Sequence, residues 1–231
     1  LMKLSLSIFY RTALISSSIF FTTEFFAQPY IDPIQIRYTQ GMPNENSAIR
    51  SFHHDWIGCD LPLKFNKTNL VIFSPTYEEW HLDSGNAIDF HSVLKSFSLP
   101  EALILSIKDS TWSLTAVPTI RWNGEQLFKS NTFQAGGALL VTYAIKPHQK
   151  FRIGLYANKE FFGTFIVPLF GIDWKINQRN YLFGVLPGRL TYEHQLSPKW
   201  YSGFTFRAPT NSYRLDSGQF LRLDDNQLSI Y

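Results

Sequence analysis

The sequence predicts an all-β fold, an antiparallel up-and-down transmembrane β-barrel of about ten to twelve strands. Three observations predict it: many segments with alternating apolar and polar residues, a secretion signal, and aromatic residues near the segment ends. A period of two places successive side chains on opposite faces of a strand. In Phe151–Ala157, for example, Phe151, Ile153 and Leu155 share one face and Arg152 lies on the other.

Residues 1–27 have the three parts of a secretory signal peptide. Two basic residues come first, Thr12–Thr23 is mostly apolar, and Ala27 precedes a polar start. A membrane helix would need around 20 apolar residues, which this stretch does not supply. We therefore expect cleavage after Ala27 and a single outer-membrane β-barrel domain over residues 28–231. A retained N-terminal anchor is the weaker alternative, because no later segment resembles a partner helix.

Composition excludes several other classes of protein. The formal net charge of +3 at pH 7 is too balanced to suggest a nucleic-acid partner. The only cysteine, Cys59, rules out an intrachain disulfide framework. A mean hydropathy of -0.10 suits a barrel whose lipid-facing and lumen-facing residues average out, but it suits a soluble β protein equally well.

Five strands are expected in the first half of the chain, each an alternating segment between polar stretches: Ile34–Gln40, Asp55–Phe65, Leu70–Trp80, Phe90–Ile107 and Trp112–Asn123. Two longer loops and two short turns should connect them: Gly41–Ser51, His81–Asp89, Asn66–Asn69 and Lys108–Ser110. Pro100 has no backbone N–H, so we expect a bend or bulge there.

The second half continues the same rhythm after a loop at Gly124–Ser130. Further strands are expected at Thr132–Ile145, Lys150–Asn158, Gly163–Ile176 and Tyr181–Leu186. Pro187–Gly188 is either a two-residue turn or a kink in one long strand. The alternation of short and long connections, typical of outer-membrane barrels, favours the turn and places a later loop at Thr210–Gly218.

Aromatic residues also favour a membrane setting. Rings with a polar edge prefer the boundary between lipid and water, where they form girdles at both rims of a barrel. A soluble β-sandwich also places tryptophan in cores and turns, which is the alternative interpretation. All six tryptophans fall near predicted strand ends: Trp56, Trp80, Trp112, Trp122, Trp174 and Trp200.

Seven charged residues lie within the predicted strands: Arg121, Arg152, Asp173, Lys175, Arg189, Glu193 and Arg207. In a soluble sandwich they would point to water. In a narrow barrel they would fill the lumen with cross-strand ion pairs and hydrogen bonds. Because a barrel of this size has little free interior, a large passive pore is not expected.

No catalytic or metal-binding motif emerges, and we predict no enzyme activity, no cofactor and no site residues. His53 and His54 are adjacent on a strand, so they should face opposite ways and not share an ion; rim or loop positions are expected. Glu78 and Glu79 are equally ill placed for a two-carboxylate site. A lipid-modifying enzyme would need His194 beside one of three serines: Ser197, Ser202 or Ser212.

Five segments carry a resemblance to known proteins: Phe170–Asn177, Tyr181–Glu193, Lys199–Gly203, Asn211–Arg214 and the opening Gln28–Asp32. They resemble a family of uncharacterised outer-membrane β-barrel proteins that is common in Bacteroidota and is named only as a domain of unknown function. The resemblance implies a barrel surrounded by outer-membrane lipid and lipopolysaccharide, inserted by the barrel-assembly machinery. It brings no catalytic residues. Family members look several strands longer, so the chain is either truncated at Tyr231 or a complete short barrel closed by Ile230–Tyr231.

Together these observations predict an integral outer-membrane β-barrel protein with a structural, small-solute or surface-interaction role. Two alternatives remain. One is a soluble secreted or periplasmic β-barrel that binds a ligand, which would need a polar outward face on every strand. The other is a barrel enzyme that modifies outer-membrane lipid.

Overall fold

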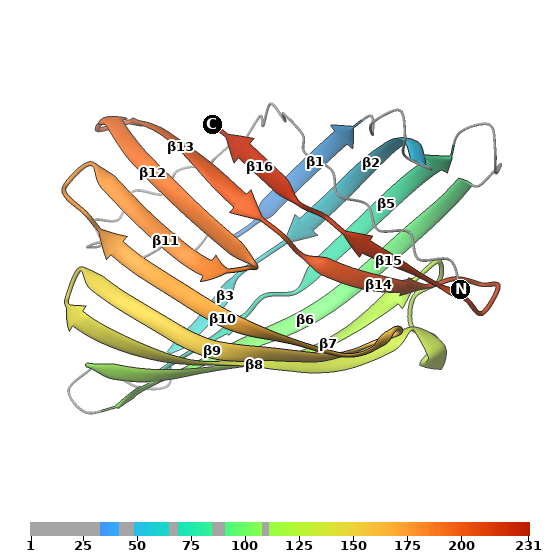
Figure 1. The fold of residues 1–231 in the computed structure, drawn as a ribbon, viewed down its shortest axis with the longest axis horizontal. Coiled ribbons are helices and arrows are strands. Elements are labelled where there is room, and N and C mark those ends of the chain that lie inside the picture. The colour runs from blue at the N-terminus through green and yellow to red at the C-terminus, as the bar shows by residue number, and fades with distance from the viewer. Residues whose placement is uncertain (1–32, 42–48, 65–68, 85–90, 108–110) are drawn as a thin grey trace.

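The computed structural model describes residues 33–41, 49–64, 69–84, 91–107 and 111–231. The predicted signal peptide at 1–27 lies outside these ranges. The described residues form one sheet of sixteen strands, shown in Figure 1. Neighbouring strands pair antiparallel, apart from a single parallel bridge between Arg214 and Gly124. The prediction of an all-β, antiparallel, up-and-down fold is therefore confirmed.

In chain order the strands are β1 (Gln35–Gly41), β2 (Ile49–Gly58), β3 (Leu61–Lys64), β4 (Leu70–Phe73), β5 (Thr76–Ser84), β6 (His91–Ile107), β7 (Trp112–Gly124), β8 (Phe133–Lys146), β9 (Gln149–Glu160), β10 (Gly163–Lys175), β11 (Asn180–Leu186), β12 (Arg189–Ser197), β13 (Trp200–Arg207), β14 (Thr210–Arg214), β15 (Phe220–Asp224) and β16 (Gln227–Ile230). One turn of 3₁₀ helix, η1 (Ser130–Thr132), precedes β8. No helix among the described residues is long and apolar enough to cross a membrane.

Four pairs of strands that follow one another in the chain are long strands with a two-residue break: β2–β3, β4–β5, β13–β14 and β15–β16. The pairing register shows this. Gly58 pairs with Thr76, and beyond the break Leu61 pairs with Phe73, so the ladder stays in step. The β13–β14 and β15–β16 hairpin keeps its register in the same way. Counted as long strands, the described sheet has twelve, which agrees with the predicted ten to twelve.

The sheet curls so that its inner face encloses a polar interior, with β1 and β16 as the two edge strands (Figure 1). Among the described residues, seventeen polar or charged side chains are buried, against nine hydrophobic ones. Large apolar side chains face outward instead: Ile153, Ile166 and Phe170 are each about 60 % exposed. This distribution is the reverse of that in a soluble globular protein.

Some predicted boundaries are wrong. β2 begins at Ile49 rather than Asp55, β5 continues to Ser84 through part of the predicted loop His81–Asp89, and β14 occupies the start of the predicted loop Thr210–Gly218. In each case polar residues were interpreted as a loop. Because these segments carry polar side chains on at least one face, their polar composition does not mark strand ends.

The two proline predictions have different outcomes. Pro187–Gly188 is a turn, since Val185 pairs with Arg189 across it, as predicted. Pro100 causes no bulge: β6 pairs with β7 in one register on both sides of it. The interruption falls on the neighbouring strand instead, between β4 and β5, where the Ser74 amide donates to the Pro100 carbonyl (3.0 Å).

Candidate functional site

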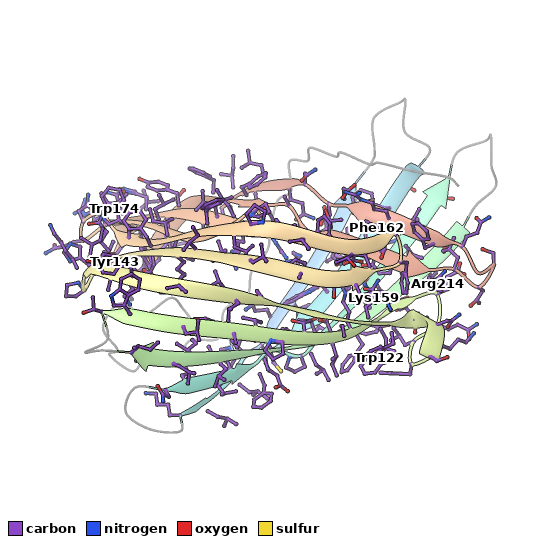
Figure 2. All side chains as sticks on the ribbon, turned by 60° about the horizontal axis from the view of Figure 1, so that its bottom comes forward. Trp122, Tyr143, Lys159, Phe162, Trp174 and Arg214 are labelled. Carbon is purple, nitrogen blue, oxygen red and sulfur yellow. The ribbon has the colours of Figure 1, made fainter. Side chains whose placement is uncertain are left out.

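The outer face of β7 and β8 carries an apolar band with aromatic residues at both limits. Trp112 pairs with Tyr143 at one end and Trp122 pairs with Phe133 at the other. Each strand therefore crosses the band in eleven residues, the two limiting residues included. Figure 2 shows Tyr143 and Trp174 at one end of the sheet and Trp122 at the opposite end. The outward residues between these limits are Leu114, Ala116, Pro118, Ile120, Ala135, Gly137, Leu139 and Val141.

The height of this band follows from strand geometry. Ten residue steps of about 3.3 Å, on strands tilted by roughly 40°, give a height of about 25 Å. That is the apolar height expected of an outer-membrane barrel. The tryptophan prediction holds only in part. Trp112 and Trp200 are exposed at strand ends, but Trp56 and Trp80 turn into the interior.

Charged side chains form ion pairs on the inner face of the curled sheet. Arg121 on β7 forms an ion pair with Glu160 on β9 and donates to Gln134 Oε1 and Asn211 Oδ1, each at 2.7 Å. A second pair joins Arg152 to Asp173 at 3.2 Å. The predicted cross-strand ion pairs are thus confirmed for three of the seven predicted charges: Arg121, Arg152 and Asp173.

Three of the other predicted interior charges lie at strand ends or contact an uncharged side chain. Lys175 and Arg189 are exposed at strand ends, and Glu193 accepts a hydrogen bond from the Tyr231 hydroxyl (3.2 Å). Glu160 was missed because the predicted strand ended at Asn158. Extending the two-residue period by one step would have placed Glu160 on the face of Arg152.

The β14–β15 hairpin lies across one end of the interior (Figure 1). Its polar side is held by Ser212, whose hydroxyl donates to Glu160 Oε2 (2.6 Å) and accepts from Gln134 Nε2 (2.9 Å). Its apolar side packs on β2, β5 and β6 in one buried cluster: Phe52, Trp80, Leu82, Leu94, Tyr213 and Leu223. The hairpin therefore fills this end of the interior.

His54 lies in the interior rather than at a rim or in a loop, which corrects the prediction. It is 1 % exposed, its ring stacks on Trp80 with centroids 3.7 Å apart, and its Nε2 lies 2.9 Å from Glu78 Oε2. Glu78 also accepts a hydrogen bond from the Tyr213 hydroxyl at 2.9 Å. His53 faces the outer side, so the two histidines point in opposite directions, as predicted.

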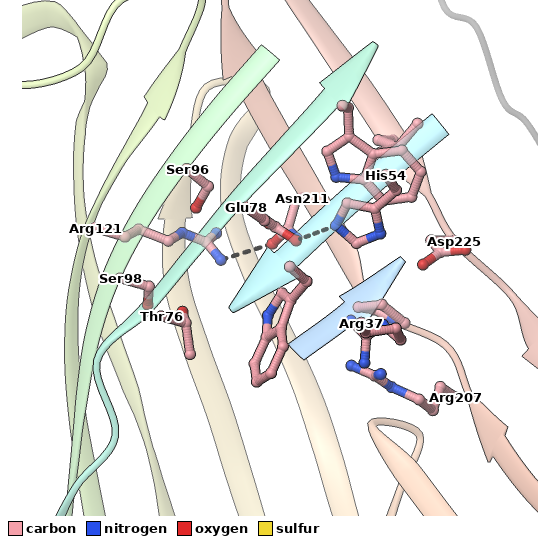
Figure 3. Close-up of a pocket in the computed structure, with 14 residues that line it drawn as sticks. Arg37, His54, Thr76, Glu78, Ser96, Ser98, Arg121, Arg207, Asn211 and Asp225 are labelled. Carbon is pink, nitrogen blue, oxygen red and sulfur yellow. Dashed lines mark hydrogen bonds and ion pairs between the residues drawn. The ribbon is translucent and has the colours of Figure 1, made fainter. Parts of the chain in front are cut away.

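Two neighbouring cavities remain within the sheet, of about 180 and 270 Å³. They share four lining residues, Arg37, Trp56, Thr76 and Arg207. Figure 3 shows both arginines projecting into the first cavity, with Asp225 above them. The Arg37 guanidinium carbon lies 4.9 Å from the centroid of the Trp56 ring, and its buried Nε has no hydrogen-bond partner.

These cavities are basic on balance. Four arginines line them, Arg37, Arg121, Arg189 and Arg207, against three acids, Asp60, Glu78 and Asp225. Arg121 and Glu78 already have charged or histidine partners. Among the described residues, no carboxylate forms an ion pair with Arg37 or Arg207. The arrangement can therefore accommodate a small anion.

The serine–histidine arrangement of a lipid-modifying enzyme is not assembled. His194 pairs across the strands with Ser202, but its Nδ1 contacts Asn180 Oδ1 (2.6 Å) and the Ser202 hydroxyl donates to the Tyr231 carbonyl (2.9 Å). Ser212 is buried in the interior hairpin. No family model, no curated protein and no solved structure matches this chain.

Proposed function

We propose that the protein is an integral outer-membrane β-barrel without catalytic activity, and that its interior binds a small anion. The observation that carries the membrane assignment is the reversed polarity of the sheet. Seventeen of its buried side chains are polar or charged, whereas its outward face carries a band of aliphatic side chains between two aromatic limits. Lipid is the surroundings in which that outer surface is stable.

The soluble alternative requires a polar outward face on every strand. β9 and β10 lack one: Phe151, Ile153, Leu155, Ile166 and Phe170 face outward and are 41 to 61 % exposed. A contiguous apolar surface of this kind is rare on soluble monomers. One acidic residue interrupts the apolar outward band: Glu101 on β6 faces outward and lies level with the middle of the band.

Membrane fractionation tests the first part of the proposal. The expressed full chain should sediment with the outer membrane, and unboiled and boiled samples should migrate differently on a denaturing gel because folded barrels resist detergent. Recovery of a detergent-free soluble monomer would overturn the assignment. Aggregated, unshifted material in the membrane fraction would also count against a stable barrel.

The anion part of the proposal rests on Arg37 and Arg207. Guanidinium groups bind phosphate and carboxylate in a bidentate way, and these two lack an ion-paired acid among the described residues. A cavity of about 180 Å³ is smaller than the roughly 300–1,000 Å³ of drug-sized pockets, so inorganic phosphate is the suitable probe.

Phosphate should quench or enhance the fluorescence of Trp56 in a saturable manner, because Arg37 lies over that ring. Arg37→Gln and Arg207→Gln should each weaken binding by about tenfold or more, since a charge-assisted hydrogen bond contributes about 1.5–3 kcal/mol. Arg179→Gln, in an exposed turn, is the matched control. Equal phosphate affinity in all variants would refute the anion role and leave the barrel assignment intact.

A further inference from the structure

The outer face of β2 and β5 carries a compact group of metal-binding side chains. His53 pairs directly with His81 across the two strands, and their rings stack with centroids 3.9 Å apart and an angle of 16° between the planes. Asp55 lies two residues along β2 and therefore shares the outward face. One ligand atom from each of the three residues lies within 4.8 Å of the other two.

This group stands just beyond the apolar band. Ring residues on adjacent strands, Tyr77, Phe97 and Trp122, lie in paired positions along the limit of the band. On the next outward positions of β2, β5 and β6 the side chains become polar and include Asp55, Glu79 and Lys95. Asp55 is exposed and the two histidines are half-buried, so the group is open to water.

We propose that His53, His81 and Asp55 bind a divalent transition-metal ion, with Zn²⁺ as the best match. Two imidazoles and one carboxylate form a typical three-residue zinc site in which water takes the fourth position. Calcium and magnesium prefer all-oxygen sites, which this group does not provide. The two strands hold the three residues on one face, and on binding their side chains would turn toward a common point, since zinc requires ligand distances of roughly 2.0–2.2 Å.

Neighbouring groups support the site. Glu79 Oε1 lies 2.9 Å from His81 Nε2, and Glu79 Oε2 accepts a hydrogen bond from the Tyr77 hydroxyl at 2.6 Å. A carboxylate that holds a ligating histidine in place is a recurrent feature of zinc sites. The site involves the outer face alone, so it does not depend on the interior anion or on membrane insertion.

Metal titration tests the proposal. The purified full chain, in detergent and freed of metal with a chelator, should bind one equivalent of Zn²⁺ in competition with a chromophoric chelator. His53→Ala and His81→Ala should each lower the affinity by about tenfold or more, and Glu79→Gln by about 10–100-fold through loss of its support. His194→Ala removes another outward histidine and should leave the affinity unchanged.

A second readout separates a built site from adventitious binding. Co²⁺ bound at the site should give the intense visible absorption of a four-coordinate centre, and this band should vanish in His53→Ala. Heat-shifted migration of each variant verifies that the barrel remains folded. If the native chain binds Zn²⁺ no more tightly than the His53→Ala, His81→Ala double variant, the proposal is wrong.

Discussion

Glu160 neutralises Arg121 where neither side chain reaches bulk water, with side-chain exposures of 0 % and 10 %. Glu160 also accepts hydrogen bonds from Asn158 (2.7 Å) and Ser212 (2.6 Å), so it joins β9, β7 and the β14–β15 hairpin. Removing one member of such a pair leaves the other charge buried without compensation. The Glu160 carboxylate should therefore contribute strongly to the free energy of unfolding.

We expect Glu160→Ala to lower the free energy of unfolding by about 3–5 kcal/mol, the usual effect of breaking a buried ion pair. The urea midpoint at which the heat-shifted band disappears measures this change. Lys129→Ala removes an exposed ion pair, Lys129–Asp216, whose atoms lie 3.6 Å apart, and should change stability by less than about 1 kcal/mol. Equal urea midpoints for the two variants would show that Glu160 does not stabilise the protein more than an exposed ion pair does.

Single residues of the interior could be predicted from the sequence only where they kept the two-residue period within a recognised strand. Arg121, Arg152 and Asp173 meet this condition, and their inward positions are confirmed. His54 does not, because β2 was expected to begin after it. Its partner Glu78 was placed on a strand, but the contact between them depends on the register of β2 against β5, which local pattern does not set.

At the level of strands, β9 clearly separates outward-facing from interior-facing positions. Leu155 is 49 % exposed on the outward face, and Arg152 on the opposite face pairs with Asp173. Ile172, on β10, also faces outward, but it lies only two residues from Trp174, near the rim. Leu155 lies deeper in the apolar band than Ile172, so a charged substitution should be more costly at Leu155.

Leu155→Arg should impair insertion, since arginine near the midplane of a bilayer costs about 2–4 kcal/mol. Ile172→Arg should cost only about 0–1 kcal/mol, because the effect falls off toward the interface. The measurement is the amount of folded protein in the outer membrane, which the intensity of the heat-shifted band gives for each of the two variants. Arg152→Leu should still insert, since it alters only the interior. Normal levels of Leu155→Arg would count heavily against the membrane assignment.

Strand prediction succeeded where the outward face is apolar and failed where the outward face, or most of the segment, is polar. The strands from β6 to β11 lie within a few residues of their expected bounds. The failures, the start of β2, the end of β5 and the whole of β14, lie beyond the band or inside the sheet. In the first two, apolar residues such as Phe52 and Leu82 lie on the inner face, and in β14 most residues are polar, so composition indicated a loop.

At the scale of the whole molecule, the β14–β15 hairpin lies across one end of the interior and is held on both of its sides. Tyr213 and Leu223 anchor the β14–β15 hairpin in the apolar cluster, and both are almost fully buried. Gln134 and Glu160 hold its other side through the Ser212 hydroxyl. We therefore expect this hairpin to prevent the passage of solutes through that end of the interior.

The native protein should accordingly give no large steady current in a planar lipid bilayer. The double variant Tyr213→Ala, Leu223→Ala should conduct, because it removes the apolar anchors that keep the hairpin across the end. Arg222→Ala is the matched control on the same hairpin: its guanidinium is exposed and pairs with Asp224 at 3.0 Å, so the current should stay at the native level. A heat-shifted band for the double variant shows that its barrel persists. A wide native conductance would mean that the hairpin does not close the interior, and the cavity between Arg37 and Arg207 would then be a stage in a pathway rather than a terminal binding site.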